Sequence, residues 1–180
     1  PTIWLIFGAY VLSVGYEKTG LGKRIALLLI RRFGSSTLGL GYAITLTDLA
    51  IAPFTPSNTA RSAGTIYPVI RNIPGLYGSE PGPTARRIGG YLMYVALCAT
   101  CVTSSMFPTA LAPNILAVLL IAETVGVIIP WIDWVTGFLP VGILLLVGMP
   151  PLIHWIYPPQ ITGVATAPVW ASDELRQLGP

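Results

Sequence analysis

Charged residues are scarce in this sequence. Only 9% of its 180 residues are Asp, Glu, Lys or Arg, whereas an ordinary soluble domain carries about 25%. Hydrophobic residues make up 53% of the chain, and the mean hydropathy is +0.72. These values argue against a soluble globular domain with long polar tails. They predict an all-α integral membrane protein that crosses the bilayer several times.

Cysteine and histidine are also rare. The two cysteines, Cys98 and Cys101, have CxxC spacing, but there is no second pair and His154 is the only histidine. Packing of small side chains in an apolar helix is therefore a better interpretation than a metal or redox site. We predict no metal and no cofactor. The chain lacks an initiating Met and a signal peptide, so we expect a fragment of a longer protein.

The distribution of charge predicts the orientation of the chain. Residues 123–133 contain no Lys or Arg and include the acids Glu123 and Asp133, so this connection is expected outside. Basic residues between apolar segments mark the cytoplasmic side of the lipid bilayer and make nucleic acid a poor partner. They are Lys18, Lys23, Arg24, Arg31, Arg32, Arg71, Arg86, Arg87 and Arg176.

Apolar runs and their interruptions divide the chain into six expected segments. Residues 1–33 are a truncated transmembrane helix, a turn at 17–24 and an interfacial helix over 25–33, basic at both ends. The remaining segments are a re-entrant helical hairpin (34–72), a cytoplasmic connection (73–87), a broken transmembrane helix (88–121), an outer connection with a transmembrane helix (122–157), and a cytoplasmic segment (158–180), where Ser172 is expected to begin a helix.

The hairpin is predicted from a polar, proline-containing stretch at residues 52–64, with apolar residues on both sides. Irregular backbone at membrane depth is tolerated only where protein buries it or it lines a water-filled cavity. A helix over 44–55 rises about 18 Å, roughly half of a 30 Å core. Ser57, Asn58 and Thr59 would form the tip and donate hydrogen bonds to an anion. The alternative is two short spans joined by this stretch outside the membrane.

A second interruption lies within residues 88–121. It contains the hydroxyls of Thr103, Ser104 and Ser105, which we assign to substrate binding, followed by a turn. A broken helix at this depth would complete a site opposite the hairpin tip. The alternative is an ordinary proline kink whose hydroxyls bond back to the helix. The residues expected in the turn are Pro108, Thr109, Pro113 and Asn114.

Catalysis is a poor interpretation of these polar groups. A nucleophilic Ser57 would need a base within hydrogen-bonding distance, and Asp48 is nine residues away, about 13 Å along a helix. There is no GxSxG motif, so we predict that the protein is not an enzyme. Asp48 could pair with a basic residue, bind a proton, or lie in an aqueous vestibule; the pairing, a structural role, is the preferred interpretation.

An ordered set of motifs resembles the divalent anion/sodium symporter (DASS) family, most closely its bacterial citrate/succinate and tartrate/succinate antiporter branch. The motifs are KTGLGKRIA (18–26), APFTPSNTAR (52–61), IGGYLM (88–93), SSMF (104–107), APN (112–114) and YPP (157–159). The resemblance implies half of an inverted-repeat elevator transporter in a bacterial inner membrane, usually a homodimer. It also implies that Ser57, Asn58 and Thr59 contact a substrate carboxylate. A second Ser-Asn-Thr, expected in the family's other half, is absent.

The family resemblance implies exchange of small carboxylate anions: citrate, succinate, tartrate, malate or 2-oxoglutarate. Sodium-coupled relatives have a glycine-rich turn whose carbonyls help to hold a cation, whereas residues 108–112 contain no glycine. Sodium-coupled symport is therefore the alternative. Arg61 is expected to compensate the substrate's charge in place of sodium, which would make exchange obligatory. Otherwise, Arg61 pairs with Asp48 or bonds to nearby carbonyls.

Overall fold

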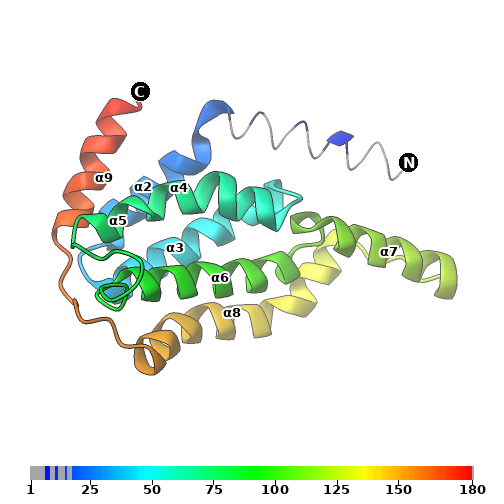
Figure 1. Cartoon of the computed structure of the whole chain (residues 1–180). Helices are drawn as coiled ribbons and strands as arrows, with labels where there is room; N and C mark the ends of the chain where they lie inside the picture. Colours follow the sequence, from blue (N-terminus) through cyan, green and yellow to red (C-terminus); the bar gives the residue numbers. More distant parts are fainter. Residues whose placement is uncertain (1–6, 9–10, 12–14, 16–17, 180) are drawn as a thin grey trace.

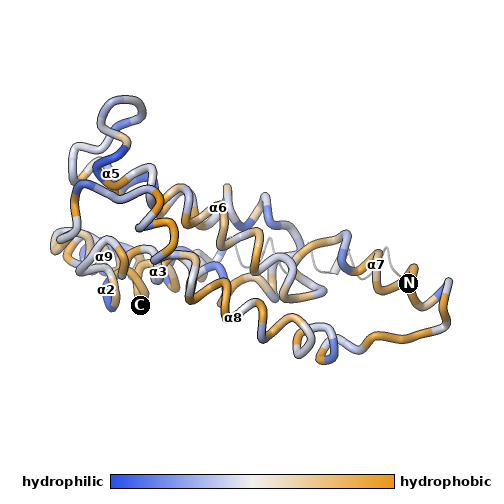
Figure 2. The backbone as a smooth tube through the Cα atoms, turned by 90° about the horizontal axis from the view of Figure 1, so that it is seen from below, coloured by the Kyte–Doolittle hydropathy of each residue, from blue (hydrophilic) through white to orange (hydrophobic). Residues whose placement is uncertain are grey.

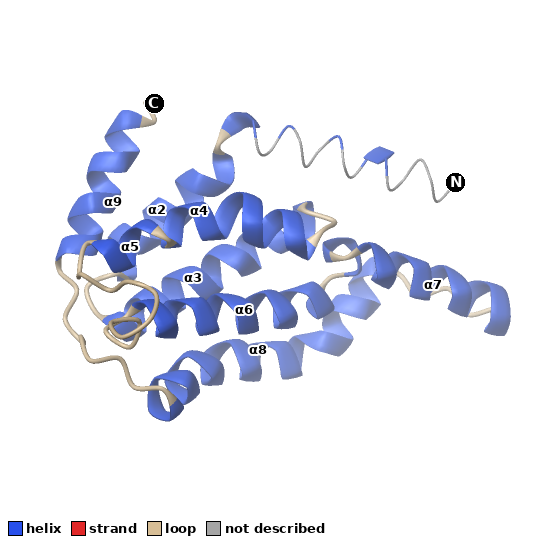
Figure 3. Ribbon diagram, in the orientation of Figure 1, coloured by secondary structure: helices blue, strands red, loops and turns tan. Residues whose placement is uncertain are grey.

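The computed structural model describes residues 7–8, 11, 15 and 18–179. This part of the chain is built from helices and loops and contains no β-strand (Figure 3). The truncated transmembrane helix expected near the start of the chain lies mostly outside the described residues. The all-helical character predicted from composition is confirmed for the rest.

The helices follow one another in Figure 1 from α2 to α9, with three short 3₁₀ or π segments, η1 to η3, between them. Their bounds are α2 Leu21–Phe33, α3 Thr37–Ile51, η1 Ala52–Phe54, η2 Ala60–Ile66, α4 Tyr67–Ile70, α5 Asn72–Gly75, α6 Gly89–Met106, η3 Pro108–Ala110, α7 Ala112–Val125, α8 Trp131–Ile156 and α9 Thr166–Gln177.

The segment from α3 to α4 is a helical hairpin. Ser36 caps α3 by accepting a hydrogen bond from the Gly39 amide at 3.0 Å. After α3 and η1 the chain turns, becomes helical again at Asn58, and returns through η2 and α4. A π-helix such as η2 is uncommon and often marks a functional position.

The predicted interruption after α6 is present. The helix ends at Met106, η3 follows, and α7 begins at Ala112 with Pro113 in its first turn. η1 of the hairpin packs against η3, so the two irregular stretches meet. Beyond this junction α7 extends away from the other helices (Figure 1), and none of its residues is buried.

Three loops meet at the opposite end of the helices. The amides of Gln160 and Ile161 donate to the carbonyls of Arg86 and Arg87, both at 3.1 Å. The Val164 amide donates to the Ser35 carbonyl at 3.2 Å. These bonds join three connections that the charge distribution predicts to be cytoplasmic; the side of the membrane on which they lie stays a prediction.

α8 is a 26-residue helix that contains Pro140, Pro150 and Pro151. A proline inside a helix leaves the carbonyl four residues earlier without its intrahelical partner. The carbonyl of Val147, four residues before Pro151, accepts a hydrogen bond from the hydroxyl of Tyr42 on α3 at 2.8 Å. The hydroxyl of Tyr91 on α6 donates to the carbonyl of Pro150 at 3.3 Å. Two tyrosines therefore join α8 to its neighbours.

Two helix starts differ from the prediction. α2 begins at Leu21 rather than at residue 25: Gly20, in a left-handed conformation (φ 66°), precedes it, and its carbonyl accepts from the Arg24 amide at 3.0 Å. α9 begins at Thr166, so Ser172 is not a cap: its hydroxyl lies inside the helix and donates to the Pro168 carbonyl at 2.9 Å. Pro168 falls in the first turn, where its missing N–H costs nothing.

Within residues 18–179, three helical stretches are long and apolar enough to cross a membrane: residues 37–54, 89–106 and 131–156. Figure 2 shows that hydrophobic residues also run along α7. Buried aliphatic residues of α2, α3, α4 and α6 form the core, including Leu27, Leu40, Val69 and Leu92. This core holds the hairpin against α6, and the polar groups of both lie at one end of it.

Candidate functional site

Arg61 is the centre of a buried polar cluster. It lies in η2, one turn after the hairpin tip, and its side chain is fully buried. A buried guanidinium is costly unless an anion and hydrogen-bond acceptors surround it. The Arg61 Nε atom lies 2.8 Å from Asp48 Oδ1, and the Asp48 side chain is also fully buried. Of the three alternatives for Asp48, the structure shows the pairing with a basic residue, Arg61.

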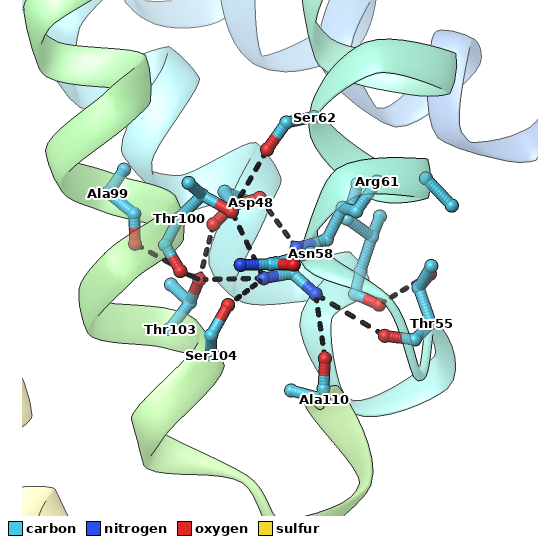
Figure 4. Close-up of polar contacts among 12 residues, drawn as sticks. Asp48, Thr55, Asn58, Arg61, Ser62, Ala99, Thr100, Thr103, Ser104 and Ala110 are labelled. Carbon is cyan, nitrogen blue, oxygen red and sulfur yellow. Dashed lines mark hydrogen bonds and ion pairs between the residues drawn. The ribbon is translucent and has the colours of Figure 1, made fainter. Parts of the chain in front are cut away.

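The other guanidinium nitrogens are bonded as well (Figure 4). Nη1 donates to the backbone carbonyls of Thr55 at 3.3 Å and Ala110 at 3.4 Å. Nη2 donates to three hydroxyl oxygens of α6: Thr100 and Thr103, both at 3.3 Å, and Ser104 at 2.8 Å. Arg61 therefore binds the tip of the hairpin, the turn after α6 and the last turns of α6 itself.

The acceptors around Arg61 come from local breaks in regular structure. Thr55 and Ala110 lie where α3 and α6 have ended, so their carbonyls have no helical partner. The guanidinium satisfies both carbonyls. Asp48 is held from the opposite side, because the Thr103 hydroxyl donates to its Oδ2 atom. One ion pair thus holds together the two stretches that the sequence analysis singled out separately.

The predicted tip residues lie next to this cluster and are more accessible. Ser57 and Asn58 are half-buried and Thr59 is exposed. Ser57 Oγ accepts from the Ala60 amide at 3.2 Å, as an N-cap does, which leaves its O–H free to donate. Thr59 donates to the Asn58 side-chain oxygen at 3.4 Å, which leaves the Asn58 NH₂ available. The amides of a helix's first turn lack intrahelical acceptors, so several donors gather at this point.

The residues expected in the turn after α6 lie there. Pro108 and Thr109 belong to η3, and Thr109 Oγ1 accepts from the Trp131 indole at 3.3 Å. Pro113 and Asn114 lie in the first turn of α7. The Asn114 side chain donates to the carbonyls of Ser104 at 2.7 Å and Phe107 at 3.1 Å. These bonds satisfy carbonyls at the end of α6 and fix the angle between α6 and α7.

The three hydroxyl residues that we assigned to substrate binding, Thr103, Ser104 and Ser105, do not all lie on the same face of α6. Thr103 and Ser104 face Arg61, whereas Ser105 is exposed and its hydroxyl donates to the Cys101 carbonyl at 3.2 Å. Sequence reasoning missed Thr100, which accepts from Arg61 and lies 3.0 Å from the Ser62 hydroxyl. The spacing of Thr100, Thr103 and Ser104 (i, i+3, i+4) was the available signal, because these positions share one helix face.

Metal ligands are not grouped in this part of the molecule. Among the described residues, no three His, Cys, Asp or Glu side chains come together. Cys98 and Cys101 are free thiols on α6, half-buried and exposed respectively. The chemistry of the cluster is therefore hydrogen bonding and charge.

A model of one protein family, described as "Sodium:sulfate symporter transmembrane region", matches residues 1–180. The chain belongs to this symporter family. The resemblance to divalent anion/sodium symporters, stated above from the motifs, is confirmed.

Relatives within the symporter family carry names that describe exchange. The chain is 50% identical over 179 residues to the citrate/succinate antiporter of Escherichia coli strain K12. It is 49% identical over 179 residues to the L-tartrate/succinate antiporters of Escherichia coli strains UTI89 and K12. Each match covers 99% of this chain and 37% of the relative, so the chain spans little more than a third of their length.

The buried ion pair gives a stability prediction. Asp48→Asn leaves the guanidinium without its counter-ion, and Arg61→Met leaves the carboxylate without its partner; each should lower the free energy of unfolding by about 3–5 kcal/mol. The double variant Asp48→Asn/Arg61→Met should lose clearly less than the sum, because neither charge is left alone. Unfolding is followed in mixed micelles with increasing SDS.

Asp173→Asn is the matched control. Asp173 and Arg176 form an exposed pair 3.7 Å apart, and its loss should change stability by less than about 1 kcal/mol. Additive effects of Asp48→Asn and Arg61→Met would show that the two side chains are not energetically coupled, contrary to the geometry.

Proposed function

We propose that the full-length protein exchanges di- and tricarboxylates across a bacterial inner membrane, with this chain supplying one half of the substrate site. The observation that carries the proposal is a hairpin tip rich in hydrogen-bond donors, directly next to a buried guanidinium. Relatives named citrate/succinate and L-tartrate/succinate antiporters are about half identical to the chain. Citrate, succinate, tartrate, malate and 2-oxoglutarate are the candidate substrates.

Carboxylate recognition is assigned to Ser57, Asn58 and Thr59. The free Ser57 hydroxyl proton, the Asn58 NH₂ group and the first amides of the returning helix can all donate to one carboxylate. The helix N-terminus adds positive potential at the same place. Thr103 and Ser104 act beneath the tip through their bonds to Arg61. For Ser105, contact with the substrate stays a prediction.

The hairpin is proposed to be re-entrant. α3 and η1 together have 18 residues, as α6 does, which corresponds to about 27 Å of helix. Both end where η1 meets η3, and α7 continues for 14 residues more, or about 21 Å. The hairpin turns back at the level where the neighbouring chain is only interrupted and then continues as α7. The hairpin tip is therefore expected inside the membrane rather than on its far side. Elevator motion and homodimer formation follow from the family and are part of the proposal.

Arg61 is proposed to replace a transported cation. A carboxylate moved to membrane depth needs positive charge nearby. In sodium-coupled relatives, the family resemblance implies that carbonyls of one turn hold a cation. Residues 108–112 form this turn here, and its Ala110 carbonyl accepts a hydrogen bond from Arg61. Asp48 carries one opposite charge 2.8 Å from Arg61, so the pair offsets only a small part of the substrate's charge and the amides of the returning helix are proposed to supply the rest.

The function is tested by counterflow. Proteoliposomes that contain the full-length protein are loaded with succinate and given labelled citrate, tartrate, malate or 2-oxoglutarate outside, in sodium or in choline buffer. Labelled anion should enter only when succinate is inside, and at equal rates in the two buffers. Sodium-dependent entry into empty vesicles would instead establish symport and would contradict the proposal.

Asn58→Ala tests the tip. Loss of one hydrogen bond to a charged group should weaken the apparent affinity for the exchanged anion about ten- to a hundredfold. Insertion and the elution volume on gel filtration should stay unchanged. Ser35→Ala, in an exposed loop at the other end of the helices, is the control. Unaltered affinity in Asn58→Ala would remove Asn58 from the site.

Arg61→Lys and Arg61→Ala separate charge from geometry. Exchange per folded protein should be lost in Arg61→Ala and partly kept in Arg61→Lys, because the charge survives but the planar fork that reaches α6 and both turns does not. The exposed Arg176→Ala should exchange normally. Full sodium-independent exchange by folded Arg61→Ala would show that Arg61 provides no charge compensation.

A further inference from the structure

A polar cavity lies away from the hairpin tip, between the first turn of α2 and the returning arm of the hairpin. Its volume is about 350 Å³. Gly20 and Lys23 line it on α2, Gly64 and Thr65 on η2, and Arg71 just after α4. Among the described residues that line the cavity, none is acidic. Arg61 and its partners are not among these residues, so the cavity is separate from the site described above.

Thr65 provides the evidence that this cavity binds a ligand. Only 7% of its surface is exposed, and its hydroxyl has no hydrogen-bond partner within the described part of the chain. Helical threonines usually bond to the carbonyl four residues earlier. Thr45 and Thr47 do so here, at 2.9 and 2.7 Å. Thr65 lies in the π-helix, whose wider turn moves that carbonyl out of line. A buried hydroxyl without a partner is costly.

The other groups at the cavity wall are donors. The first turn of α2 borders the cavity through Gly20, Gly22 and Lys23, and Gly20 has no side chain that could cap the helix; the amides of a helix's first turn lack intrahelical acceptors. Arg71 is exposed, and its side chain has no ion-pair partner among residues 18–179. Lys23 lies 3.0 Å from Glu174 of α9, which neutralises part of its charge and leaves Arg71 as the principal cation.

We propose that this cavity binds a phosphate-type oxyanion between α2 and the returning arm of the hairpin. Thr65, the first-turn amides of α2 and Arg71 each donate to one of its oxygens. The ligand is the headgroup of an anionic phospholipid or a free phosphate, because both present the same oxygens. α2 favours the lipid, since Leu21 and Leu28 are exposed beside its basic residues, as on helices that lie at a membrane surface. The proposal does not depend on carboxylate exchange.

The test uses the delipidated full-length protein in detergent. Thermal unfolding is measured with dioctanoyl phosphatidylglycerol, with dioctanoylglycerol, which lacks the phosphate, and with sodium phosphate against sodium chloride at equal ionic strength. Stabilisation by phosphatidylglycerol alone identifies a lipid headgroup site. Stabilisation by inorganic phosphate as well identifies a site for the free anion. No stabilisation by either would overturn the proposal.

Variants assign the binding to this cavity. Thr65→Val removes the hydroxyl at constant shape, and Arg71→Gln removes the cation on an exposed residue; each should weaken the affinity about tenfold or more. Thr124→Val and Arg31→Gln, which do not line the cavity, should bind normally. Asn58→Ala should also bind normally, which separates this site from the hairpin tip. If Thr65→Val does not fold, Arg71→Gln decides. Equal binding by Arg71→Gln and the parent protein would place the anion elsewhere.

Discussion

The fold around the candidate site depends on one buried ion pair. Asp48 and Arg61 are both inaccessible to solvent and lie 2.8 Å apart. Neither could be buried alone without a large free-energy cost. From η2, the Arg61 guanidinium bonds to Asp48 of α3, Ala110 of η3 and Ser104 of α6. One side chain thus connects four helical segments. The packing of the hairpin against the broken helix is therefore set by electrostatics at this end and by aliphatic contacts elsewhere.

Burial of the pair divides the polar residues into two groups. Arg61, Asp48, Thr103 and their partners are deep and fully bonded, so they provide a rigid base. Ser57 and Asn58 are accessible and retain free donors. A site that must bind and release an anion benefits from this division, because the donors keep their geometry without the ligand. The proposed contact residues are thus presented by a cluster that need not move.

The sequence predicts the local features well. Prolines and runs of hydroxyl residues inside apolar segments mark the hairpin tip and the break after α6, because their effect on the backbone acts within a few residues. The sequence leaves three alternatives for Asp48. Whether Arg61 reaches Asp48 depends on how closely the two arms of the hairpin pack, which the sequence does not specify. Sequence reasoning misses the start of α9 at Thr166, because a serine followed by acidic residues, as at Ser172, resembles an N-cap. The role of Thr100 also needs the tertiary contact.

The bonds from Tyr42 and Tyr91 to α8 have a mechanical consequence. Prolines within a long helix normally create a hinge, because the unbonded carbonyl lets the two halves bend. In α8 the carbonyl freed by Pro151 is bonded to Tyr42 of α3, and the next bond along the helix joins Pro150 to Tyr91 of α6. Bending at Pro151 would break a bond to a neighbouring helix. The two bonds therefore tie α8 to α3 and α6 at its prolines and oppose bending there.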